Sequence, residues 1–297
     1  MPQVINTNMM SINAQRNLNR SQGSMQTSLE RLSSGLRINR AKDDAAGLAI
    51  AERFTSQVRG LEQSVRNAND GVSMLQTAEG ALEELQNALQ RMRELGIQAK
   101  NGTYNFSDRS SLNDEFQALK AEVKRIGKVA EFNQINLVGS NHSVEFQVGW
   151  ENGADNIIKV SFLNLLSNTN ASGGMGELLS GSAATAGTHS VALIATTSAS
   201  DAVSHISYAI TAISNALERV SEMRADFGAV QNRLESSVRN MENVVENQSA
   251  ARSRIRDADF ARETANMTRT QILQQAGTAM LAQANQLPQN VLQLLQG

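Results

Sequence analysis

Apolar side chains recur every three or four residues along most of the chain, a spacing that places them on one face of a helix. The longest series runs from Val203 to Val245, and Arg224 and Gln231 interrupt its register. Its apolar members are Val203, Ile206, Ile210, Ile213, Leu217, Val220, Phe227, Leu234, Val238, Met241 and Val245. A repeat of about 3.5 residues that persists over so many turns predicts a long helix in a left-handed coiled coil.

Two further helices are predicted in the first half of the chain. One carries an apolar series from Leu61 to Met92 and should end near Asn101, where a glycine follows. The other carries an apolar series from Leu112 to Ala130, with Ser107 or Asp108 as its N-cap. Three complementary apolar faces predict a helical bundle. Its expected packing residues are Leu61, Leu75, Leu89, Ile210, Leu217, Phe227 and Leu234.

The two ends of the chain carry apolar series of their own. The C-terminal one has an unusual polar face, because 271–297 contains no charged residue. Such a helix is a poor solvent-exposed element, and ordering it costs about 1–2 kcal/mol per residue. We therefore expect the ends to become ordered when neighbouring copies of the chain cover their apolar faces. The residues expected in this assembly core are Met25, Leu29, Leu32, Leu36, Leu273, Met280, Leu287, Val291 and Leu294.

The middle of the chain has a different pattern. Apolar and polar residues alternate over 144–148 and again over 158–162, and the pair Asn152-Gly153 lies between them. This favours a β-hairpin. Residues 167–200 are rich in Ser, Thr, Ala and Gly, which indicates an exposed insertion.

The predicted fold class is mainly α: a long antiparallel coiled-coil or helical-bundle rod with paired terminal helices and a small β-hairpin region. The predicted domains are an N-terminal core helix (1–42), N-terminal rod helices (43–140), a hairpin with a variable insertion (141–200), a C-terminal rod helix (201–255) and a C-terminal core helix (256–297).

Composition argues against several classes of function. The chain has no Cys, which removes thiolate catalysis and Cys-ligated metals. Its net charge of −2 argues against a nucleic-acid partner, and no stretch of about 18 apolar residues suggests a membrane span. His142, His189 and His205 match no metal-binding spacing. We expect no catalytic residue, cofactor or metal.

Three charged features have structural interpretations. The adjacent carboxylates Asp43 and Asp44 precede a predicted helix, so capping is favoured over a paired catalytic site. The arginines at 252, 254 and 256 are followed by Asp257 and Asp259, which favours ion pairs between subunits or between helices over a nucleic-acid patch. Arg224 has two open interpretations: a polar residue that sets the helix register, or a packed aliphatic stem with its charge in solvent.

Several distinctive sequence blocks lie near both ends of the chain. They read SINAQRNL at 11–18, LSSGLRIN at 32–39 and AKDDAAGLAI at 41–50, then SRIRDADFA at 253–261, with AQANQ at 282–286 and VLQLL at 291–295. These blocks resemble the N- and C-terminal regions of bacterial flagellin, and the resemblance covers about residues 1–140 and 200–297.

The resemblance implies a structural subunit that polymerises into the hollow helical flagellar filament, the propeller for swimming. It implies export of the unfolded chain by the flagellar type III apparatus to an extracellular filament. The implied partners are many identical subunits, an export chaperone, the filament cap and the hook–filament junction proteins. It also implies contact with a host Toll-like receptor through Gln90, Arg91, Leu95 and Glu115.

Two alternatives remain at this stage. A hook–filament junction protein shares flagellin-like ends but is present in few copies. A secreted coiled-coil translocator or adaptor would use the terminal faces on a membrane, although 271–297 lacks the basic polar face of such helices.

Overall fold

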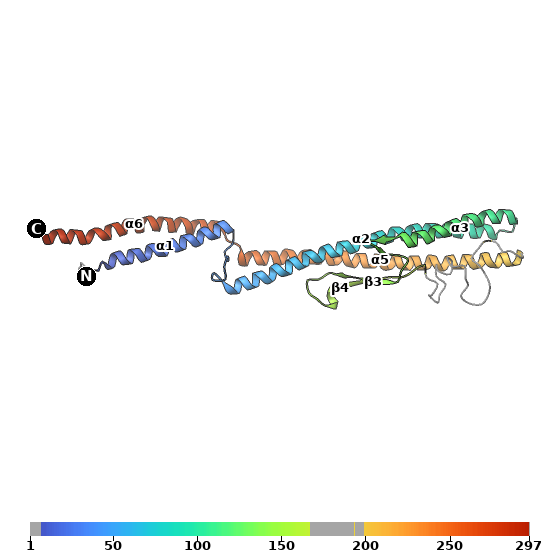
Figure 1. Cartoon of the computed structure of the whole chain (residues 1–297), viewed down its shortest axis with the longest axis horizontal. Helices are drawn as coiled ribbons and strands as arrows, with labels where there is room; N and C mark the ends of the chain where they lie inside the picture. Colours follow the sequence, from blue (N-terminus) through green and yellow to red (C-terminus); the bar gives the residue numbers. More distant parts are fainter. Residues whose placement is uncertain (1–6, 167–192, 194–198, 297) are drawn as a thin grey trace. The chain divides into compact units, whose positions relative to one another are not determined.

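The structure, a computed structural model of the full chain, describes residues 7–166, 193 and 199–296, with the backbone alone at 199–202 and 287–296. Its elements are α1 (Met9–Ser34), α2 (Ala45–Lys100), α3 (Phe106–Val129), β1 (Glu131–Phe132), β2 (Ile135–Asn136), β3 (His142–Gln147), η1 (Ala154–Asn156), β4 (Ile157–Phe162), α5 (Ala199–Arg256) and α6 (Phe260–Gln296) (Figure 1). The chain divides into two compact units, one formed by 1–58 with 245–297 and the other by 59–244.

The first unit is built around the antiparallel pair of α1 and α6, which lie side by side (Figure 1). The side chain of Asn8 caps α1 by accepting from the amide of Ser11 at 3.1 Å. Gly35 ends α1 with a φ of 71°, in the left-handed region where glycine carries no penalty, and its amide donates to the carbonyl of Arg31. Asp259 caps the N-terminus of α6, because its Oδ1 accepts hydrogen bonds from the amides of Ala261 and Arg262.

The segments that follow α1 and precede α6 pair with each other. Leu36 and Asp257 form an isolated antiparallel bridge. The amide of Arg37 donates to the carbonyl of Arg256 at 2.7 Å, and the amide of Ala258 donates to the carbonyl of Gly35 at 2.9 Å. The non-helical segments at 35–37 and 256–258 therefore satisfy each other's backbone hydrogen-bonding groups.

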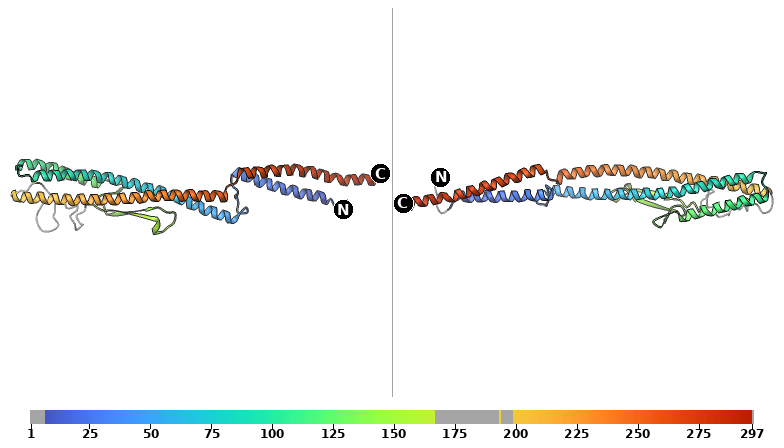
Figure 2. Two further views of the ribbon diagram at one scale, coloured as in Figure 1. Left: turned by 180° about the vertical axis from the view of Figure 1, so that it is seen from behind. Right: turned by 90° about the horizontal axis from the view of Figure 1, so that it is seen from above.

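In the second unit α2, α3 and α5 run side by side (Figure 2). The core is aliphatic and follows one face of α2, with Leu75, Leu82, Leu85, Leu89 and Met92 fully buried. Phe116 of α3 and Phe227 of α5 are buried as well. The close approach of α5 to α2 is visible at Gly96, where an added methyl group would lie 3.1 Å from the side chain of Ile210.

The hairpin of β3 and β4 packs on this bundle. Its antiparallel register pairs Val144 with Val160 and Phe146 with Ile158. Phe162 is buried, and its ring centroid lies 5.2 Å from that of Phe227. The hairpin is thus held to α5 by an aromatic contact as well as by burial of its apolar face.

The structure confirms the mainly α class, the long helix that ends at Lys100 and the hairpin between 142 and 162. The predicted cap of α3 is wrong, because Asn105 forms the N-cap and Asp108 completes a capping box from the third helical position. A second small hairpin, β1–β2, was not predicted, and its turn places Asn133 and Gln134 at positive φ. The predicted insertion at 167–200 lies outside the described residues, apart from Leu193 and the start of α5.

Candidate functional site

The terminal helices carry the residues that the sequence assigns to an assembly core. Met25, Leu32 and Leu36 are half-buried in the single chain. By contrast, the side chain of Leu29 is 60% exposed, Leu273 is 50% exposed and Met280 is 64% exposed. The side chains of Leu287, Val291 and Leu294 lie outside the described part of the chain.

The same two helices expose further apolar side chains besides the predicted assembly-core residues. Met9, Met10 and Ile12 of α1 and Ile272 of α6 are each more than two-fifths exposed. An open groove of about 630 Å³ lies between the helices, lined by Leu18 and Ala14 on one side and by Gly277 and Met280 on the other. This surface has the apolar character expected of an interface.

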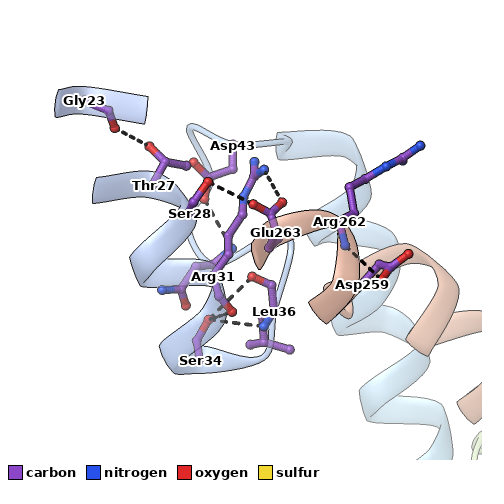
Figure 3. Close-up of polar contacts among 11 residues, drawn as sticks. Gly23, Thr27, Ser28, Arg31, Ser34, Leu36, Asp43, Asp259, Arg262 and Glu263 are labelled. Carbon is purple, nitrogen blue, oxygen red and sulfur yellow. Dashed lines mark hydrogen bonds and ion pairs between the residues drawn. The ribbon is translucent and has the colours of Figure 1, made fainter. Parts of the chain in front are cut away.

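A polar cluster anchors α1 to α6 beside this apolar surface (Figure 3). The hydroxyl of Ser28 donates to Glu263 Oε2 at 3.0 Å, and Arg31 Nη1 donates to Glu263 Oε1 at 3.1 Å. Sequence reasoning missed this cluster, because a Ser, an Arg and a Glu about 230 positions apart carry no motif. The only hint was that Ser28 and Arg31 share a helix face with the apolar series.

The two adjacent carboxylates serve the segment between α1 and α2. Asp43 Oδ2 accepts from the amides of Asn39 and Arg40, and Asp44 Oδ1 accepts from the amide of Gly47 in the first turn of α2. The hydrogen bond from the Arg40 amide is the main reason why the pKa of Asp43 lies below its ordinary value, and nearby cationic side chains add to this. The geometry is that of caps and a turn.

The residues that the resemblance assigns to receptor contact lie in the second unit. Arg91 is the centre of an exposed ion-pair network, with Nη2 2.8 Å from Glu115 of α3 and Nη1 3.1 Å from Glu94. The hydrogen bonds to Glu115 and Glu94 raise the pKa of Arg91. Gln90 is exposed beside it. Leu95 is the exception: its side chain is fully buried, so in this structure it cannot touch a partner directly.

The expected rod-packing residues fall into two groups. Leu61, Leu75, Leu89, Phe227 and Leu234 are buried. Ile210 and Leu217 are half-buried. They share a heptad position with Arg224 and Gln231, which are also half-buried, so this position lies at the edge of the packed face along α5.

The two polar interruptions of the α5 series meet the same residue of α2. Arg224 Nη1 donates to Gln86 at 2.6 Å, and its Nη2 lies 3.6 Å from Glu79. Gln231 donates to the other oxygen of Glu79 at 3.3 Å. The head of Arg224 is therefore bound to α2, which favours the interpretation as a polar residue that sets the helix register.

Two further candidate residues, Arg256 and His142, have structural partners. Arg256 forms an ion pair with Glu52 at 3.2 Å, in line with ion pairs between helices. The ring of His142 stacks on Phe162 with centroids 4.7 Å apart, and His189 lies outside the described residues. In the part of the chain that the structure describes, no three His, Asp or Glu residues gather as metal ligands. Nor does any described helix contain a stretch long and apolar enough to cross a membrane.

Comparisons with known proteins agree on one family. Residues 5–142 match the bacterial flagellin N-terminal helical region, and residues 210–295 match the bacterial flagellin C-terminal helical region. A flagellin of Halalkalibacterium halodurans is 45% identical over 295 residues, which cover 98% of this chain and 99% of the relative. The flagellar filament 33 kDa core protein of Treponema phagedenis is 40% identical, with 98% and 99% covered. Flagellin A of Vibrio cholerae is 37% identical over 382 aligned positions, again with 98% and 99% covered.

These matches extend over almost the full length of both partners and take in the terminal helices as well as the second unit. They favour neither a junction protein nor a translocator. The matched family consists of structural filament proteins and not of enzymes. The chain therefore belongs to the bacterial flagellin family and is a structural subunit of the flagellar filament.

Proposed function

We propose that the chain polymerises by burying the apolar faces of α1 and α6 against the same faces of neighbouring copies. The observation that carries this proposal is the exposure of Leu29, Leu273 and Met280 in the single chain, at 60%, 50% and 64%. The assembly core would also include Met25, Leu32 and Leu36 and, further along α6, Leu287, Val291 and Leu294.

The energetics support assembly through these faces. Fully burying a Leu or Met side chain contributes about 1.5–3 kcal/mol. Because Leu29, Leu273 and Met280 are 50–64% exposed, each would gain roughly half of this on assembly, and the other exposed apolar residues of α1 and α6 would add to it. The uncharged stretch 271–297 removes the desolvation cost that ionised side chains would add to such an interface. An isolated chain leaves these side chains exposed and gains none of this stabilisation, whereas each copy that joins the filament gains it.

A substitution of an exposed apolar residue tests this proposal. Met280→Asp should leave the isolated chain folded, since the side chain is already 64% exposed. It should prevent growth of filaments on seeds, because the carboxylate would be buried without a partner. Gln271→Asp is the matched control and should polymerise normally, because Gln271 is exposed and lies nine residues before Met280, on the opposite face of α6. Filaments of normal diameter from Met280→Asp, or from a chain that lacks 271–297, would refute the proposed role of α6.

We further propose that the subunit is exported to an extracellular filament. Export of an unfolded chain through a narrow channel suits a sequence without Cys, which cannot form a disulfide in transit. The C-terminal region would bind an export chaperone, which would cover its apolar residues before assembly. The filament cap and the hook–filament junction proteins would be the further partners.

A Toll-like receptor contact is proposed for the exposed network on α2 and α3. Gln90, Arg91 and Glu115 would meet the receptor, with Leu95 supporting them from below. Arg91→Glu should abolish receptor signalling by the folded monomer. Arg125→Glu in α3 is the matched control, since Arg125 is also an exposed arginine paired with a glutamate, Glu122, at 2.7 Å. Equal signalling by both variants would contradict this assignment.

A further inference from the structure

The best-buried side chains between α1 and α6 are not the large apolar ones. Among the side chains described in α1, Ser28 alone is buried, at 6% exposure. In α6 the buried ones are Glu263, also at 6%, and Ala284, at 7%. The pair of helices therefore combines an open apolar surface with a closed polar contact near one end.

The closed contact satisfies both oxygens of one carboxylate. Glu263 Oε2 accepts from Ser28 Oγ at 3.0 Å, and Glu263 Oε1 accepts from Arg31 Nη1 at 3.1 Å (Figure 3). The side chain of Glu263 is 8% exposed and that of Arg31 is 28% exposed. Ser28 and Arg31 are three residues apart and so face the same side of α1. A carboxylate this deeply buried is costly unless such partners are in place.

Apolar contacts alone do not fix how far α6 is displaced along α1. The groove further along the pair is lined by small or flexible residues, among them Ala14, Leu18, Ala276, Gly277 and Met280. A slip of two helical turns, or seven residues, would replace one such contact by a similar one. The same slip would bring Thr270 opposite Ser28 and Arg31 and would leave Glu263 without its donors. Among the side-chain contacts between the two helices, the polar cluster distinguishes the two registers most strongly. It acts together with the backbone pairing of 35–37 with 256–258 and with the hydrogen bond from Asn8 Nδ2 to the Ala284 carbonyl at 2.7 Å.

We infer that Ser28, Arg31 and Glu263 form a register lock that selects one alignment of α1 on α6. The lock acts within one chain, where it positions α1 and α6 against each other without contacting other copies. Its consequence for assembly rests on the proposed function, because a single alignment is what gives every subunit the same composite apolar surface.

Disulfide trapping measures the register directly in the full chain, because the chain has no cysteine of its own. A methyl group at Gly277 would lie 3.3 Å from the side chain of Leu18, so Leu18→Cys with Gly277→Cys reports the observed register. Leu18→Cys with Ala284→Cys reports the register slipped by seven residues. Oxidation of the dilute monomer traps even briefly formed cysteine pairs. The ratio of the two rates of disulfide formation therefore gives the preference for the observed register over the slipped one.

The observed-register pair should form at least about tenfold faster than the slipped pair, the selectivity that charged hydrogen bonds supply. With Glu263→Ala added, the ratio should fall by about threefold or more, because the slipped pair becomes faster while the backbone pairing of 35–37 with 256–258 remains. Glu263→Gln, which keeps the shape but loses the charge, should lower the ratio in the same direction. Glu30→Gln is the matched control. Glu30 is also on α1, but its carboxylate pairs with Arg40 at 2.8 Å in the segment that follows α1, so the ratio should stay unchanged.

Two results would overturn the register lock. One is a ratio in Glu263→Ala that stays within twofold of the parent. The other is an equal slowing of both disulfides, which would mean that Glu263 only holds the helices together. Neither result bears on the proposed assembly faces, which the Met280→Asp variant tests separately.

Discussion

Trp150 lies so close to Gly60 that a methyl group at residue 60 would come within 2.8 Å of the Trp150 Cβ. The contact joins the loop between β3 and β4 to α2. The hydroxyl of Ser64, one turn further along α2, donates to the carbonyl of Gly149 at 3.0 Å. Gly60 is therefore needed for the close approach of the hairpin loop and not for an unusual backbone angle.

Gly60→Ala should lower the free energy of unfolding of the second unit by about 1–3 kcal/mol, because the added methyl group forces the loop away from α2. Trp150 is the sole tryptophan of the chain, so its fluorescence reports on this loop specifically. Gly80→Ala is the matched control, since nothing lies within 4 Å of its added methyl group. Because alanine favours a helix interior, Gly80→Ala should raise the unfolding free energy by up to about 1 kcal/mol. Equal stability of the two variants would contradict the proposed packing.

The ring of Phe227 should be a main contributor to the stability of the second unit. It is 1% exposed and packs against Phe162 with centroids 5.2 Å apart. Phe227→Ala should cost about 3–5 kcal/mol in denaturant unfolding, since it leaves a cavity between α5 and β4. Phe106→Ala, at a phenylalanine that is 68% exposed, should change stability by less than about 0.5 kcal/mol. A small loss for Phe227→Ala would show that the hairpin is not held by this contact.

The turn at 39–43 should depend on pH through Asp43. Because hydrogen bonds from the Arg40 and Asn39 amides hold the folded pKa of Asp43 below its ordinary value, its contribution is complete above about pH 4. It is lost as the pH falls through the lower folded pKa. Titration of the Asn39 and Arg40 amide shifts by NMR should give a midpoint below that of an unstructured aspartate. Asp43→Asn should remove the transition, and a midpoint at or above the ordinary value would contradict the turn.

The long apolar series of the sequence predicted most of the second unit. Leu75, Leu89 and Leu234 are fully buried as expected, because a repeat sustained over many turns defines a helix face without further information. The hairpin was also predictable, since strict alternation over 144–148 and 158–162 has only one simple structural meaning.

Local polar chemistry was harder to predict. Asn105, Ser107 and Asp108 are all good capping residues, and only the backbone geometry decides that Asn105 is the cap. The turn between β1 and β2 uses Asn133 and Gln134 at positive φ, without the glycine that would mark it in the sequence. The Ser28–Glu263 contact depends on how α1 and α6 meet, which no local pattern encodes.

The central claim is that neighbouring copies cover the apolar faces of α1 and α6, and amide hydrogen exchange tests it most directly. In dilute monomer the amides of 9–27 and 265–286 should exchange fast, because Met9, Leu273 and Met280 gain little burial in a single chain. In the filament the same amides should exchange at least about 100-fold more slowly, while those of α2 change little. Equal protection of these segments in monomer and filament would contradict the claim.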